Sequence, residues 1–249
     1  LSLGNPLLFS CSCAGMAHIH DRGFIHRDVK PQNVLLNGTG DALICDLGTV
    51  KNMTPGEDFE SYAERKEYDM EAPMAMTTRL GTPLYMAPEQ MRCETYNNAV
   101  DVWAYGIMMV RLFGLGDPYH SSITLQELKT QVSTNEIKPN TLDVKDLPHP
   151  RLKELVEGCV EFRPGERYTF EQIEVKLSKI LKEVEATSHQ EKELRAVLKQ
   201  HSIGQYYDEL VADGVASKED LVYVTVEDLI GLGVKKIEAR KVVAAFSSQ

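Results

Sequence analysis

The chain has 249 residues, 43% hydrophobic and 26% charged, a balance ordinary for folded proteins and sufficient for one large or two smaller domains. Its formal net charge of −10 argues against nucleic-acid binding, because nucleic-acid-binding proteins present a basic face. No run reaches the roughly 18 apolar residues of a membrane-spanning helix. Five cysteines without a repeated spacing favour a reducing, cytoplasmic compartment over a disulfide framework.

The first ten residues, LSLGNPLLFS, are apolar but contain neither a basic region nor an initiator methionine. A secretory signal begins with a basic region, so this start is interpreted as the cut edge of a longer chain. Helical spacing then predicts a helix from Leu7 to His20, with Gly23 as the residue that ends it. The face expected to be apolar comprises Leu8, Cys11, Gly15 and Ile19.

A short hairpin and a long polar segment are expected next. Two apolar runs flank a glycine-rich turn in VLLNGTGDALICD, which predicts two antiparallel strands. The stretch from Leu47 to about Thr82 is polar and rich in acidic residues, and it is expected to be mobile. A loop of this length in a compact domain is usually functional.

The remainder of the chain has a helical pattern. Ala99 to Gly114 is almost wholly apolar and predicts a central buried helix. Further helices are expected at Leu125–Val132, Leu152–Cys159 and Phe170–Val184. Residues 185–193 are charged and lack aliphatic side chains, so they are expected to link a domain at 1–184 to another at 194–249.

The loop that follows the first helix contains residue types suited to phosphate chemistry. Asp28 is followed by Lys30 and Asn33, and the hairpin is expected to fold Asp46 back beside them. Carboxylate and amide oxygens suit Mg²⁺, which also binds substrate phosphates. A carboxylate that does not bind the metal can orient a hydroxyl and accept its proton. The cluster therefore predicts phosphoryl transfer, which depends mainly on positioning and charge neutralisation.

Five sequence blocks resemble those of eukaryotic protein kinases, in the family's order. HRDVKPQN resembles the catalytic loop and DLG the metal-binding motif, while GTPLYMAPE and DVWAYG resemble the end of the activation segment and the start of the central helix. CVEFRPGERYTFEQI resembles a late block whose arginine is Arg167 here. The match covers about Leu7 to Val184. It implies a mainly α fold for residues 1–184, the large C-terminal kinase lobe with a small β-hairpin.

The resemblance implies ATP and Mg²⁺ as cofactors and protein serine or threonine as the acceptor. Asp28 would be the catalytic base, and Asn33 and Asp46 the metal ligands. Lys30 would contact the transferred phosphate, and a lysine at this position is similar to serine/threonine-directed members of the family. Thr82 would lie in the substrate-facing loop near Asp28.

Other positions would support this site. His26 and Leu47 would pack in an internal apolar column, Asp101 would hold the catalytic-loop backbone, and Glu89 would pair with Arg167. These roles are structural rather than chemical.

Arg27 precedes Asp28, as in kinases that are controlled by phosphorylation of the activation segment. A phosphate on Thr77 or Thr78 would add negative charge that this arginine can bind, which would order the segment. Thr77 and Thr78 are therefore the candidate phosphorylation sites.

The sequence contains neither the glycine-rich phosphate loop nor the strand lysine of the small kinase lobe. Leu35 would form the floor under adenine, but the opposite wall is missing, so little MgATP binding is expected from this chain alone. Two hypotheses follow, a serine/threonine kinase that is complete only with an upstream segment, or a catalytically inactive scaffold. The sequence upstream of Leu1 would distinguish them.

Residues 194–249 resemble a SAM domain, a five-helix protein-interaction module. HSIGQYYDELVADGV and VTVEDLIGLGVKKIEARKVVAAF carry the resemblance, and Thr225 with Asp228 forms a capping-box pattern at a helix start. The terminal helix is basic, with Lys235, Lys236, Arg240 and Lys241, whereas the middle of the module is acidic. Opposite faces of this kind suit self-association or docking to another SAM domain. An ordinary solvated surface is the alternative.

Overall fold

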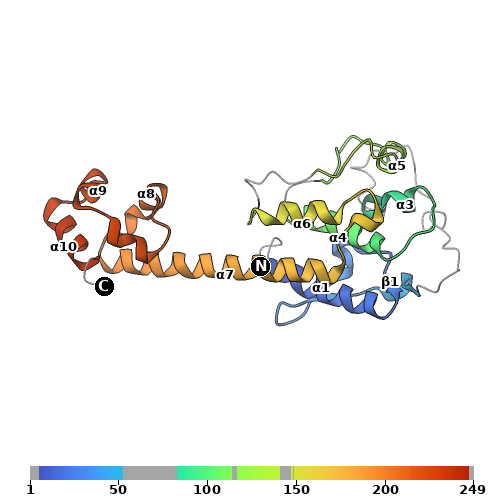
Figure 1. Ribbon diagram of the computed structural model, residues 1–249, viewed down its shortest axis with the longest axis horizontal. Helices are drawn as coiled ribbons and strands as arrows, with labels where there is room; N and C mark the ends of the chain where they lie inside the picture. The colour runs from blue at the N-terminus through green and yellow to red at the C-terminus, as the bar shows by residue number, and fades with distance from the viewer. Residues whose placement is uncertain (1–5, 53–82, 114–116, 141–146, 148, 247–249) are drawn as a thin grey trace. The chain divides into compact units, whose positions relative to one another are not determined.

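The computed structural model describes residues 6–52, 83–113, 117–140, 147 and 149–246. The chain forms two compact units, 1–181 and 182–249, and each is considered by itself. Helices predominate in both units (Figure 1), and the described strands form only two small two-stranded sheets. A mainly helical fold with a small hairpin is thus confirmed.

The first unit opens with a helix, α1 (Pro6–Asp21), that ends as predicted at Gly23, which adopts φ 74° and donates its amide to the His20 carbonyl at 2.9 Å. The predicted hairpin is also confirmed, because β2 and β3 are antiparallel and pair Val34 with Ile44. The elements of this region are β1 (Phe24–Ile25), η1 (Pro31–Asn33), β2 (Val34–Leu36), β3 (Ala42–Ile44), η2 (Leu47–Thr49) and β4 (Lys51–Asn52), of which β1 pairs with β4.

The buried face of α1 differs from the prediction. The residues that are buried are Phe9, Ser12, Cys13, Met16, Ala17 and His20, whereas Cys11, Gly15 and Ile19 are only half-buried. The buried face differs from the expected one because α1 packs against neighbours on two sides. One side contacts the helical core, where the Ser12 hydroxyl lies 2.9 Å from the Tyr105 hydroxyl, and the other lies against β3.

The predicted central helix is confirmed as α4 (Ala99–Leu112), in which every residue from Val100 to Val110 is buried. It packs against α6, and α3 packs against α5 (Figure 1). These helices form the core against which the loop between β1 and η1 is held. The other elements of this part of the chain are η4 (Pro83–Tyr85), α3 (Pro88–Met91), α5 (Leu125–Ser133), α6 (Arg151–Cys159) and η6 (Pro164–Glu166).

The helix expected to end near Val184 instead continues, and α7 runs from Phe170 to Gln200 (Figure 1). Residues 185–193, expected to link two domains, are therefore helical. The scarcity of aliphatic side chains was misleading, because Ala, Glu, Gln and Lys favour helix without any burial. Ion pairs spaced four residues apart add support, at 3.0 Å between Glu191 and Arg195 and 3.4 Å between His189 and Glu193.

The second unit contains the end of α7 and four shorter helices around its own core. The helices are η7 (Gly204–Tyr206) continuing into α8 (Tyr207–Ala212), η8 (Lys218–Tyr223), α9 (Val226–Gly231) and α10 (Lys236–Phe246). Their core includes Leu194, Leu198, Leu210, Leu229 and Phe246. The predicted capping box is confirmed, since Thr225 and Asp228 exchange bonds of 2.8 and 3.2 Å. In the described part of the chain, no helix is both long and apolar enough to cross a membrane.

Candidate active site

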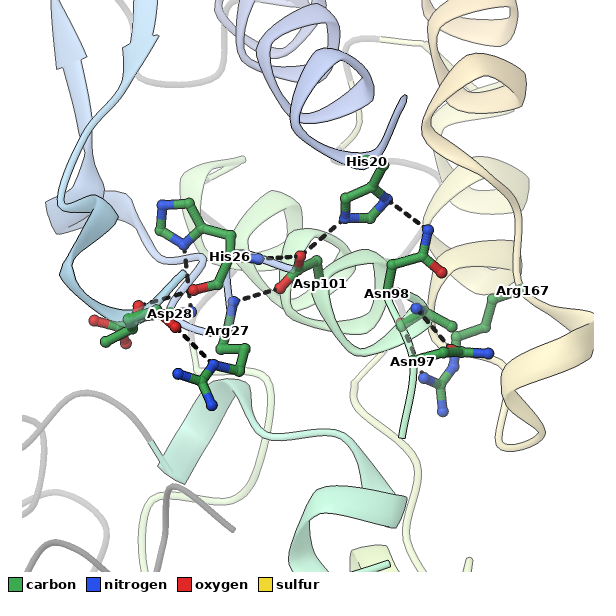
Figure 2. Close-up of polar contacts among 10 residues, drawn as sticks. His20, His26, Arg27, Asp28, Asn97, Asn98, Asp101 and Arg167 are labelled. Carbon is green, nitrogen blue, oxygen red and sulfur yellow. Dashed lines mark hydrogen bonds and ion pairs between the residues drawn. The ribbon is translucent and has the colours of Figure 1, made fainter. Parts of the chain in front are cut away.

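The loop between β1 and η1 is held in place by one carboxylate of α4. Asp101 is 1% exposed and accepts bonds of 2.8 Å from the backbone amides of both His26 and Arg27 (Figure 2). Arg27 has φ 68°, a left-handed conformation that a non-glycine residue adopts only when its surroundings impose it. The predicted role of Asp101, holding the loop backbone, is confirmed.

A histidine that sequence reasoning did not assign to the site completes this support. His20 lies at the end of α1, with Nε2 2.9 Å from Asp101 Oδ2 and Nδ1 3.2 Å from the Asn98 amide nitrogen. Because the amide nitrogen can only donate, Nδ1 accepts, and the protonated Nε2 donates a hydrogen bond to Asp101. The only signal in the sequence was a histidine at a helix end, six residues before the HRD motif.

His26 connects the loop to the segment after β3. Its side chain is fully buried, with Nε2 3.1 Å from the Cys45 carbonyl and Nδ1 accepting from the Asp28 amide at 3.3 Å. The Thr49 hydroxyl donates to the His26 carbonyl at 2.8 Å. The expected packing of His26 is confirmed. These contacts set the position of Asp28 relative to the residues around Asp46.

Asp28, Lys30 and Asn33 form a compact cluster above this support. The Lys30 ammonium donates to Asp28 Oδ2 at 2.6 Å, and the Asn33 amide donates to the same oxygen at 3.1 Å and to the Asp28 carbonyl at 2.7 Å. Asp28 and Asn33 are 6% exposed, so their geometry is set by the fold rather than by solvent. The sequence prediction that these three side chains converge is confirmed.

Asp46 is brought to the same side by the hairpin. The Cys45 amide donates to the Asn33 carbonyl at 2.9 Å, which places the next residue beside the cluster. Asp46 has φ 61°, and its exposed carboxylate makes no hydrogen bond to any described side chain. A side chain at Gly48 would place Cβ 3.3 Å from Asp46 Oδ1, so glycine leaves that oxygen accessible.

The oxygen atoms of Asn33 and Asp46 fit a hard divalent cation. The Asn33 amide nitrogen is fully engaged with Asp28, so its Oδ1 is the atom left to act as a ligand. One carboxylate and one amide oxygen are typical of Mg²⁺, which completes its shell with water and phosphate oxygens. The donor set thus fits magnesium.

Arg27 is engaged within the described region. Its Nε donates to the Thr49 carbonyl at 2.6 Å, which ties the arginine to η2. The predicted phosphate-pairing role therefore requires the terminal nitrogens, which can still donate bonds. Thr77, Thr78 and Thr82 lie outside the described residues.

Two leucines to which the sequence assigned roles, Leu35 under adenine and Leu47 in an internal column, lie at the surface. Leu35 on β2 is 55% exposed and Leu47 is 60% exposed. The expectation that Leu47 packs with His26 in an internal column is wrong for the described structure, because no described element covers η2 at this point. The apolar face of Leu35 remains suited to a flat ring.

The predicted pairing of Glu89 with Arg167 is confirmed as a buried ion pair. Arg167 makes bonds of 2.6 and 2.8 Å to the two oxygens of Glu89. The side chains are 0% and 3% exposed. The pair joins α3 to the segment that precedes α7 and supports the site without forming part of it.

Comparison with known proteins agrees with this geometry. Residues 7–177 match the protein kinase domain family, so the chain belongs to the protein kinases. Residues 194–248 match a second family, described as SAM domain-like. Both resemblances inferred from the motifs are confirmed.

Several curated relatives of the kinase region are named serine/threonine-protein kinases. The chain is 30% identical over 170 residues to serine/threonine-protein kinase PknD of Chlamydia caviae, covering 65% of this chain and 17% of that protein. It is 32% identical over 183 residues to a probable serine/threonine-protein kinase of Dictyostelium discoideum, with 74% and 22% covered. The Drosophila melanogaster kinase fused is 29% identical over 161 residues, with 64% and 17% covered. The chain thus spans about a fifth of the length of these relatives.

Proposed function

We propose that the first unit is the catalytic lobe of a protein serine/threonine kinase that transfers the γ-phosphate of ATP to a protein hydroxyl. The observation that carries this proposal is the cluster of Asp28, Lys30 and Asn33, with bonds of 2.6 to 3.1 Å in a nearly buried setting. Kinase membership alone implies ATP and Mg²⁺ in general terms. The serine/threonine assignment is supported by Lys30 and by the names of the relatives.

Each residue of the cluster has a proposed role. Asp28 orients the acceptor hydroxyl and takes its proton, while Lys30 offsets the negative charge of the transferred phosphate. Asn33 Oδ1 and the Asp46 carboxylate hold Mg²⁺, which neutralises charge on the phosphates when bound. Leu35 supports the adenine ring.

Further proposals concern residues and boundaries around this cluster. Thr82 faces the substrate, and phosphate on Thr77 or Thr78 pairs with Arg27. The catalytic domain spans 1–184 and the SAM domain 194–249, with helical residues 185–193 between them. Five free cysteines fit a reducing, cytoplasmic location.

Replacing Asp28 by asparagine is expected to lower phosphate transfer by about a thousandfold, because a general base typically contributes 10²–10⁴-fold. The assay measures transfer from labelled ATP to a serine-containing protein by the natural full-length product. Asp21→Asn is the matched control, since Asp21 is exposed at the end of α1. Equal activity of the D28N variant and the wild type would refute the proposed role.

The competing function is a scaffold without catalysis, acting through the second unit. It is distinguished by titrating MgATP against the 249-residue chain and the full-length product while following thermal unfolding. A shift for the full-length product alone supports the kinase. Absence of a shift for both favours the scaffold.

For the second unit we propose self-association between an acidic and a basic surface. The acidic surface surrounds a cavity of about 500 Å³ near Asp213, Asp220 and Asp228. The basic surface lies at the start of α10, where Ile237 is 70% exposed and is flanked by Lys236 and Arg240. An exposed apolar side chain between cations complements an acidic cavity with an apolar floor, so a second copy is the proposed occupant.

Charge reversal is expected to abolish this association. Arg240→Glu and Asp213→Lys should each weaken self-association at least tenfold, because like charges then face each other. An equimolar mixture should recover a dimer, since each variant retains one intact surface. Sedimentation velocity measures both effects. Lys192→Glu is the control, because Lys192 is an exposed residue of α7. Monomeric wild-type protein at high concentration would disprove the proposal.

A further inference from the structure

Tyr223 stands out among the tyrosines of the described residues. It ends η8 at the rim of the acidic cavity, and its side chain is 81% exposed. The other described tyrosines are buried or half-buried: Tyr85, Tyr96, Tyr105, Tyr119, Tyr168, Tyr206 and Tyr207. Tyr223 is therefore the most accessible tyrosine among the described residues.

The position is anchored although the ring is free. Leu221 and Val224, on either side, are 2% and 6% exposed. The chain leaves the 3₁₀ helix at Val224 with an extended backbone, φ −70° and ψ 124°. Tyr223 is therefore presented on a fixed support, at the end of the 3₁₀ helix.

The surroundings of Tyr223 are acidic. Asp220 accepts from the backbone amides of Ser217 and Ala216, and these bonds lower the pKa of its carboxyl group. The Thr225 amide similarly lowers the pKa of Asp228. Glu219 and Glu227 are exposed in the same stretch. The nearest cation in sequence, Lys218, lies 3.2 Å from Glu193 and is thereby partly neutralised.

We propose that Tyr223 is a phosphate acceptor for a separate tyrosine-directed kinase whose substrate groove is basic. The phenolic oxygen attacks the γ-phosphorus of ATP, the bond to ADP breaks, and the phenolic proton passes to a base of that enzyme. The exposed hydroxyl and the flanking carboxylates provide access and charge recognition, respectively. The proposed serine/threonine-directed site of the first unit takes no part in this transfer.

The modification regulates the self-association surface, a consequence that rests on the proposed function of the second unit. A phosphate adds about 1.5 to 2 negative charges and three acceptor oxygens at the rim of the cavity. Because Tyr223 is 81% exposed and lines the cavity, the phosphate adds negative charge to the acidic surface that would face Arg240 and Lys236 of a second copy. Phosphorylation therefore strengthens association.

The acceptor is tested on the 249-residue chain, incubated with MgATP and a purified tyrosine-directed kinase that prefers acidic substrates. Peptide mass spectrometry is expected to find phosphate on Tyr223 at least tenfold more than on Tyr206 or Tyr207. Tyr223→Phe should remove this signal, whereas Tyr206→Phe should leave it. Comparable modification of Tyr206 and Tyr207, or none of Tyr223, overturns the inference.

The regulatory effect is tested by sedimentation of the modified and unmodified chains. Phosphorylated protein is expected to associate about tenfold more tightly, and the difference should vanish near 1 M salt, where the Debye length is about 3 Å. Unchanged or weaker association overturns the regulatory effect. If the unmodified chain is monomeric throughout, self-association fails as a function, and the mass-spectrometric result still decides whether Tyr223 is the acceptor.

Discussion

The Arg167→Met variant is expected to lose about 3–5 kcal/mol of folding free energy, because breaking a buried ion pair leaves an uncompensated charge. All five N–H donors of Arg167 are satisfied in the wild type. Beyond the two bonds to Glu89, the guanidinium donates to the carbonyls of Glu161, Ala99 and Phe162 at 2.7, 3.0 and 3.2 Å. Methionine fills much of the volume but supplies no donor, so one carboxylate and three carbonyls lose their partner.

The single tryptophan provides a reporter for this unit. Trp103 is 2% exposed, and the Arg167 guanidinium lies 5.1 Å from its ring centre. Urea unfolding followed by Trp103 fluorescence therefore measures the first unit without a contribution from the second. Arg163→Met is the matched control, because Arg163 pairs with Glu166 on the surface at 3.1 Å, where such pairs contribute about 0–1 kcal/mol.

A double variant separates the ion pair from general packing. Combining Arg167→Met with Glu89→Gln removes the buried charge, so the double variant should be more stable than the sum of the single losses predicts. Strict additivity would show that the two side chains are not coupled. A loss no larger than that of the Arg163 control would disprove the assigned role.

The parts of the site that the sequence predicted are those whose contacts are short-range or tied to a motif. Asp28, Lys30 and Asn33 lie within six positions, so the loop itself brings them together. The distant pair of Glu89 and Arg167 became predictable only through family resemblance, since nothing local in either segment indicates the other.

Other features depend on contacts that a linear pattern does not contain. His20 joins the site because α1 ends where α4 begins, 81 residues later in the chain. The Arg27 bond to the Thr49 carbonyl requires a left-handed backbone that an arginine does not favour on its own. The continuation of α7 to Gln200 was not predicted for a different reason. The prediction relied on apolar residues that would be buried, whereas this part of the helix is supported by helix propensity and surface ion pairs.

Replacing Asp101 by alanine is expected to cost about 3 kcal/mol or more, because two buried donors and one part-buried donor lose their acceptor at about 1–3 kcal/mol each. Those donors are the amides of His26 and Arg27 and the Nε2 of His20. Water cannot replace the carboxylate easily, since Asp101 is 1% exposed and His20 and His26 are also buried. Trp103 fluorescence during urea unfolding measures the loss.

Asparagine at the same position gives a sharper test. The amide has one oxygen and one donor group, so at least one of the three N–H donors must face another donor whichever way it is oriented. Asp101→Asn should therefore lose less stability than alanine but more than Asp117→Asn, the control at a half-buried pair of 3.5 Å with Arg111. Equal stability of the three variants would contradict the assigned network.

The loss of the Asp101 carboxylate is expected to affect the loop between β1 and η1 before it affects the unit as a whole. Arg27 adopts φ 68° because Asp101 holds its amide, and a non-glycine residue in this region costs about 1–3 kcal/mol when unsupported. Without the carboxylate, the loop is expected to lose its fixed backbone conformation. Hydrogen exchange should then accelerate more at the Arg27 and Asp28 amides than at the amide of Val102, which lies within α4. Uniform exchange across these amides would instead indicate global destabilisation and would remove the basis for a specific positioning role of Asp101.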